Sequence, residues 1–117
     1  FNWGVVATSK PTTLWVSRFL EGGVLILDPL SGELMHRVSL SFGVRSLLSD
    51  PVTGLVWAAA SYSGKLWALE QSPPYERRSF NLCGQTRDIV SDVDGRVTVA
   101  TDCGLYRIDP SAWGQRE

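Results

Sequence analysis

Short runs of β-branched, aliphatic and aromatic residues alternate along this chain with clusters of turn-forming residues. Between the runs stand segments such as Asp50-Pro51-Val52-Thr53-Gly54, rich in residues that favour tight turns. Extended strands favour the residue types of the apolar runs, so the pattern predicts strands joined by turns. No stretch sustains the apolar period of about 3.6 residues that an amphipathic helix needs, and no helix of consequence is expected.

The pattern repeats with a period of about 40 residues. Trp15 and Trp57 occupy matching places 42 residues apart in the sequence. Asp28, Glu70 and Asp109 end matching runs, at separations of 42 and 39 residues. Because three sets of similar segments recur in the same order, the chain is expected to contain three structural units of one kind.

Each complete unit is expected to hold four short strands. The predicted strands are 3–8, 13–18, 23–28 and 33–40, then 44–49, 55–60, 65–70 and 75–82, then 86–91, 96–101 and 104–109. Four antiparallel strands in about 40 residues form the blade of a β-propeller. The predicted fold class is all-β: a partial β-propeller of about three four-stranded antiparallel blades, at about 1–42, 43–84 and 85–117. The last blade lacks its outer strand.

A family resemblance follows from particular residues in the third unit. Asp92-Val93-Asp94-Gly95, followed by Gly104-Leu105-Tyr106-Arg107-Ile108-Asp109-Pro110, resembles the two-component-regulator type of propeller repeat. Segments 43–70 and 23–40 resemble NHL, streptogramin-lyase-like and YVTN repeats. The resemblance implies the architecture and no single function, since these families range from sensors and scaffolds to a few enzymes. Thr98 departs from the pattern, standing where a Trp is usual.

The number of blades bears on function. Known propellers close with roughly four to eight blades, so three would leave two open end faces and, in the third blade, an open strand edge. A second copy could complete a six-bladed ring, the chain could be a segment of a longer propeller, or a partner protein could cap the arc. A closed monomer of another β fold is a further alternative. The first three all need an interface, and they predict a protein-interaction or scaffold module.

Composition and charge narrow the classes of partner. The chain has 44% hydrophobic and 20% charged residues, which is typical of globular proteins, and a net charge of −1. This balance gives no electrostatic reason to expect nucleic acid or a membrane as partner. No apolar run approaches the roughly 18 residues of a membrane-spanning helix. Nothing in the sequence indicates a compartment.

Three residues at matching starts of the first strands, Trp3, Arg45 and Arg87, are expected near the mouth of the propeller channel. Two guanidinium groups and an indole would suit a small anionic or carbohydrate ligand, because Arg matches carboxylate and phosphate geometry. The alternative is that the arginines pair with local acids such as Asp88, or face solvent. A ligand site here would make the protein a sensory propeller.

Loops on the same face add two candidates to this site. Tyr62, between the second and third strands of the second unit, could stack on a sugar, although plain packing would also explain an aromatic residue there. Asp102 occupies the equivalent loop of the third unit. Acids in these loops would bind a cation only if they converged, and no metal or cofactor is expected.

The chain contains only two cysteines and one histidine. Cys83 and Cys103 both fall on this loop side and are either a disulfide between the second and third units or two free thiols. His36 is the single histidine and belongs to an outer strand. A streptogramin-lyase-like reaction would need a catalytic histidine at the channel, and no nucleophile elbow is present. The sequence therefore predicts a binding protein and no enzyme.

Overall fold

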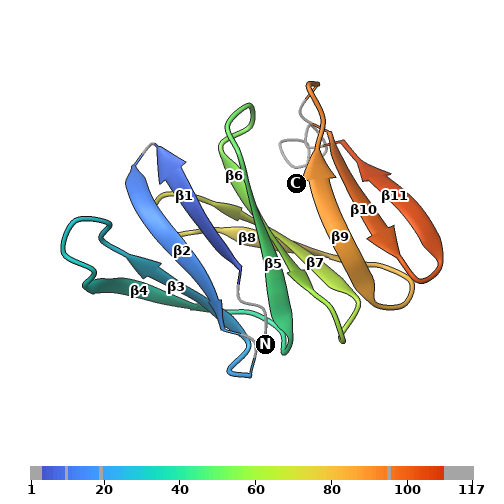
Figure 1. The fold of residues 1–117 in the computed structure, drawn as a ribbon, viewed down its shortest axis with the longest axis horizontal. Coiled ribbons are helices and arrows are strands. Elements are labelled where there is room, and N and C mark those ends of the chain that lie inside the picture. Colours follow the sequence, from blue (N-terminus) through green and yellow to red (C-terminus); the bar gives the residue numbers. More distant parts are fainter. Residues whose placement is uncertain (1–3, 10, 19, 95, 110–117) are drawn as a thin grey trace.

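The computed structural model describes residues 4–9, 11–18, 20–94 and 96–109, and these form three antiparallel sheets side by side (Figure 1). Blade 1 contains β1 (Val5–Ser9), β2 (Thr12–Arg18), β3 (Gly23–Leu27) and β4 (Leu34–Ser39). Blade 2 contains β5 (Val44–Asp50), β6 (Leu55–Ala60), β7 (Lys65–Glu70) and β8 (Arg77–Asn81). Blade 3 contains β9 (Thr86–Ser91), β10 (Val97–Thr101) and β11 (Gly104–Ile108).

Every sheet is a meander in which each strand pairs with its neighbours in the chain. The described residues contain no helix, and so none that could cross a membrane. Among them, blade 3 has three strands where the other two blades have four. The predicted all-β partial propeller is confirmed, and within residues 86–109 the third blade shows three strands and no outer one.

Aspartates fix the turns between the first and second strands of blades 2 and 3. Asp50 Oδ1 accepts a hydrogen bond from the Val52 amide at 3.0 Å, and its Oδ2 accepts one from Thr53 Oγ1 at 2.8 Å. Asp92 Oδ1 accepts the equivalent bond from the Asp94 amide at 2.9 Å. A short carboxylate side chain that bonds the backbone two residues ahead stabilises a turn. The turn residues of the sequence therefore position these strands.

The hydrophobic core is divided between the two contacts that join the blades. All six side chains of β6 are buried, in contrast to a strand with one face in solvent. Because alternate residues of a strand point to opposite faces, β6 contributes to both cores. The first core contains Trp15, Val24, Ile26 and Val38 of blade 1 with Val44, Val56, Ala58, Ala60, Leu69 and Tyr75 of blade 2. The second contains Leu55, Trp57, Ala59, Leu66 and Ala68 of blade 2 with Ile89, Val97 and Val99 of blade 3.

The last strand of blade 2 begins later than the sequence predicts. It spans Arg77–Asn81, and the predicted 75–82 includes Tyr75, whose φ of 57° is left-handed and incompatible with a strand. Tyr75 turns into the first core, where its ring meets Trp15 edge-on at 5.8 Å between centroids. It also lies 5.0 Å from the ring of His36. Burial of this ring against blade 1 therefore decides where β8 starts.

Candidate functional site

One face of the arc is built from the loops that join the blades. We call it the loop face; it consists of the connections 40–43 and 82–85 between the blades and of the described residues 18, 20–23, 60–64 and 101–104 in the hairpin turns beside them. Each of the two connections between blades lies between two hairpin turns and forms a backbone hydrogen bond with both of them. The bonds run from Leu40 N to Gly22 O, Ser61 N to Gly43 O, Leu82 N to Gly64 O and Asp102 N to Gln85 O, at 2.8–3.1 Å. The loop face is thus a continuous, hydrogen-bonded rim.

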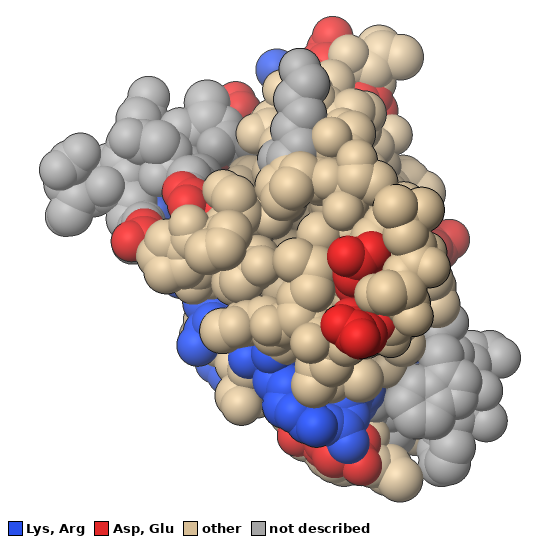
Figure 2. Space-filling view, turned by 90° about the vertical axis from the view of Figure 1, so that its left-hand side faces the viewer, with Lys and Arg blue, Asp and Glu red and all other residues tan. Residues whose placement is uncertain are grey.

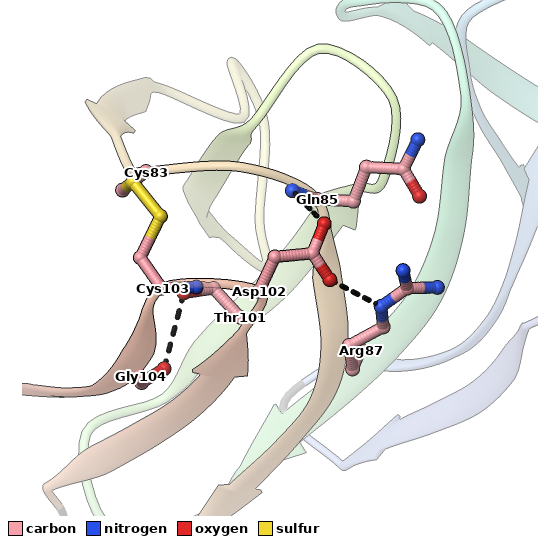
Figure 3. A network of polar contacts seen from close by, with 7 residues as sticks. All are labelled: Cys83, Gln85, Arg87, Thr101, Asp102, Cys103 and Gly104. Atoms are coloured by element: carbon pink, nitrogen blue, oxygen red, sulfur yellow. Dashed lines mark hydrogen bonds and ion pairs between the residues drawn. A yellow bond between two sulfur atoms is a disulfide. The ribbon is translucent and has the colours of Figure 1, made fainter.

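Arg87 and Asp102 form an ion pair on this face (Figure 3). Arg87 Nε donates to Asp102 Oδ1 at 2.8 Å, and the Gln85 amide donates to Asp102 Oδ2 at 3.3 Å. The bond from Arg87, followed by the one from Gln85, lowers the pKa of Asp102 below its ordinary value, so this carboxylate is ionised at neutral pH. Asp88, the acid suggested by the sequence, instead accepts a bond from the Ile89 amide at 2.8 Å.

A disulfide lies beside this ion pair. Cys83, in the connection between blades 2 and 3, is bonded to Cys103, in the turn between β10 and β11, with 5.7 Å between their Cα atoms. The Cys83 amide also donates to the hydroxyl of Tyr106 at 3.0 Å. Gly84 has a φ of 72°, and a Cβ added to it would lie 3.0 Å from the Cβ of Asp102. The connection is therefore held closely against blade 3.

An aromatic pair occupies the next part of the loop face. The rings of Tyr62 and Phe42 are nearly parallel, with 20° between planes and 6.3 Å between centroids. The two residues are 57% and 49% exposed. Next to Phe42 in the chain, Ser41 Oγ accepts hydrogen bonds from Trp67 Nε1 at 2.9 Å and from Ser63 Oγ at 3.2 Å. Two partly exposed rings from neighbouring loops thus place aromatic surface on the loop face.

The predicted ligand residues fall into separate places. Arg87 and Asp102 are brought together as an ion pair, whereas Tyr62 is paired with Phe42. Arg45 is exposed at a register irregularity in β5. Trp3 lies outside the described residues. Sequence reasoning did not assign Phe42 to the site, although its place before Gly43, in a connection between blades, puts it on the same loop face.

An open groove lies at the opposite end of the blades. It has a volume of about 1030 Å³ and lies between the end of β1, the β5–β6 turn and the start of the β7–β8 connection. Gln71 lines it; Nε2 donates to the Gly54 carbonyl at 2.9 Å, while Oε1 is buried without a hydrogen-bond partner. None of the predicted site residues that the structure describes lines this groove. In the described part of the chain, no three His, Cys, Asp or Glu side chains gather as a metal site.

Blade 1 turns an apolar sheet face away from blade 2. We call it the outer face of blade 1. Strand pairing places on it Val5, Ala7, Leu14, Val16, Leu25 and Leu27. Val5 is 57% exposed, and Leu14, Val16, Leu25 and Leu27 are only partly buried. On this side of the molecule, uncharged side chains cover most of the surface, with a group of Asp and Glu to the right of its middle and Lys and Arg gathered below (Figure 2).

Comparisons with solved structures agree with this architecture. No family model matches the sequence, and no curated protein does. The Kuenenia stuttgartiensis hydrazine synthase structure matches 95% of this chain and 33% of its own, with a TM-score of 0.83 at 14% identity. A streptogramin B lyase structure matches 92% of this chain and 40% of its own, with a TM-score of 0.67 at 16% identity. A Bacteroides caccae protein of unknown function matches 92% and 46%, with a TM-score of 0.73 at 16% identity.

These similarities establish the fold and no activity, because the identities are low. This chain spans from about a third to under half of each of those solved chains. The resemblance to propeller repeats that the sequence predicts is confirmed at the level of architecture.

Proposed function

We propose that this chain is a protein-interaction or scaffold module made of propeller blades, which completes a ring with further blades. Those blades come from a second copy, as in a six-bladed homodimer, or from other polypeptide. The observation that carries the proposal is the outer face of blade 1. An apolar sheet face needs a covering layer, because burial contributes about 25 cal/mol per Å² of apolar area removed from water.

The repeat itself supports this reading. The outer face of blade 1 is equivalent to the face of blade 2 that carries Val56, Ala58 and Leu69. Those three side chains are 0% exposed, because blade 1 covers them. Their counterparts in blade 1, which are Leu14, Val16 and Leu27, retain exposed area. Contiguous apolar surface of this kind marks interaction sites in soluble proteins.

A charge introduced on the outer face of blade 1 tests the proposal. We expect the native chain to self-associate or to bind a dye for exposed apolar surface, and Val16→Glu to reduce both. Light scattering after size exclusion and dye fluorescence would measure the two effects. Glu33→Gln, in an exposed turn of the same blade, is the matched control and is expected to change neither. A native chain that behaves identically to Val16→Glu in both assays would refute the proposal.

A second candidate function is binding of a small anionic or carbohydrate ligand on the loop face. The stacked pair of Tyr62 and Phe42 favours the sugar, since a ring platform suits the apolar side of a pyranose. The ion pair with Asp102 offsets the charge of Arg87, which leaves Arg45 as the stronger attraction for an anion. No catalytic step is proposed: His36 lies on β4, with its ring against Tyr75.

Titration calorimetry with maltose and with citrate separates the two ligand classes. Sugar binding is expected to disappear in Tyr62→Ala and to persist in Tyr62→Phe, which keeps the ring. Anion binding is expected to disappear when Arg45 and Arg87 are both changed to Glu. If neither probe binds the native chain at millimolar concentration, the loop face has no such site.

A further inference from the structure

The chemistry of the outer face of blade 1 specifies its partner more closely, provided that the proposed interaction function holds. We propose that this face takes a propeller blade whose second strand carries a tryptophan. We further propose that blade 3 of a second copy is not that blade. The argument uses the two contacts between blades that the structure already contains.

Both existing contacts place an indole at the same position. Trp15 on β2 and Trp57 on β6 are each 0% exposed and face the following blade. Their cross-strand neighbours on the third strands are Ile26 and Ala68, which are also 0% exposed. Directly opposite residues of an antiparallel pair share a sheet face. In blades 2 and 3, therefore, the sheet face that corresponds to the outer face of blade 1 is covered by the preceding blade. The covering residues include a tryptophan and its aliphatic cross-strand neighbour.

Blade 3 has a different pair at this position. On β10, Thr98 stands where the other second strands carry Trp, and its cross-strand neighbour is Arg107 on β11. We call the face that holds them the outer face of blade 3. Strand pairing also places on it Asp88, Val90, Ala100 and Leu105. Leu105 is 76% exposed and Val90 is 52% exposed.

Charge disfavours contact between the outer faces of two copies. No Asp or Glu occurs within β1 to β4; the flanking acids Asp28 and Glu33 belong to the connection between β3 and β4, where Asp28 Oδ1 already accepts a bond from the Leu30 amide. Arg37, the cross-strand neighbour of Leu25, lies on the outer face of blade 1 as well. Closing a ring of two copies would press Arg107 against an apolar layer that carries a second guanidinium. The desolvation penalty of a buried charge without a partner is larger than the stabilisation that the surrounding apolar contacts provide.

Mutation can introduce into blade 3 the tryptophan and small apolar neighbour that blades 1 and 2 carry. Thr98→Trp/Arg107→Ala converts the outer face of blade 3 to the chemistry of blades 1 and 2. We expect this variant to self-associate with a dissociation constant at least about tenfold lower than that of the native chain, measured by sedimentation velocity. A head-to-tail contact of this kind gives a closed ring or an open chain of copies, and either result supports the proposal.

Three controls accompany the experiment. Adding Val16→Glu to the double variant is expected to reverse the association, which locates it on the outer face of blade 1. Val93→Trp places an indole at a 94% exposed turn position and is expected to leave the mass unchanged. Arg107→Ala alone removes the charge without adding a large side chain, and it is expected to strengthen association by a smaller factor. This single variant tests the inference even if the double variant does not fold.

Two results would overturn the inference. One is a native dimer that Arg107→Glu and Val16→Glu both dissociate, which would make a second copy the partner. The other is a folded double variant that associates no more tightly than the native chain, which would mean that a tryptophan is not what this face takes. Neither result touches the proposed interaction function, which fails only if Val16→Glu has no effect on the native chain.

Discussion

Removing the disulfide between Cys83 and Cys103 should destabilise the protein by a calculable amount. The bond closes a loop with a sequence separation of 20 residues. In the chain-entropy model, a loop of that length restricts the unfolded chain by about 3 kcal/mol at 25 °C. Both cysteines are exposed, so replacing them leaves no cavity to add to this figure. The expected loss for Cys83→Ala/Cys103→Ala is therefore about 3 kcal/mol.

Equilibrium urea unfolding measures the loss. With a denaturant dependence of about 1.5 kcal/mol per M, the midpoint is expected to fall by about 2 M. Dithiothreitol should lower the native midpoint to the same value and leave the double variant unchanged, which serves as the control. Coincident midpoints for the oxidised native chain and the double variant would contradict the reasoning. So would two reactive thiols in the oxidised native chain.

Further changes test the core and the loop face. Trp57→Ala should lower the free energy of unfolding by about 3–5 kcal/mol in thermal or urea unfolding, because it empties a fully buried position. Trp57→Phe should cost less, since the indole N–H is buried without a partner. Gly84→Ala should cost about 1–3 kcal/mol, because its φ is left-handed and its new Cβ would crowd Asp102. The pKa of Asp102 is lower in the folded state than in the unfolded state. The stabilisation of the fold by ionised Asp102 is therefore fully present above the pKa of the unfolded state and is lost as the pH falls through the pKa of the folded state. When unfolding midpoints are measured as a function of pH, Asp102→Asn should lack the part of the acid destabilisation that comes from protonation of Asp102. A pH profile identical to that of the native chain would argue against the ion pair.

The strands could be predicted because their signals are local. Alternating apolar residues and turn aspartates such as Asp50 act within a few residues, so the sequence places most strands to within a residue or two. Tyr75 shows where this reasoning stops. Its side chain is 3% exposed in a core that also involves Trp15, and this packing with a distant segment overrides a strand-like local sequence.

The candidate site depends even more on distant contacts. The pairing of Arg87 with Asp102 joins β9 to the β10–β11 turn, and no local pattern distinguishes it from a pairing with Asp88. The stack of Phe42 and Tyr62 likewise joins two loops that are twenty residues apart. Position within the repeat predicts which face a loop occupies. It does not predict which of the side chains on that face meet.

The meander within each sheet has a consequence for how such a chain changes in evolution. Each strand pairs only with its neighbours in the chain, so the segments 40–43 and 82–85 are junctions at which no hydrogen-bonded ladder is interrupted. Gene duplication or recombination at these junctions could add or remove whole blades without rethreading a sheet. Cys83, in the second junction, is bonded to Cys103 in blade 3. Recombination after Cys83 would separate the two cysteines and leave each without its partner. The first junction is therefore the more permissive place for growth of the array.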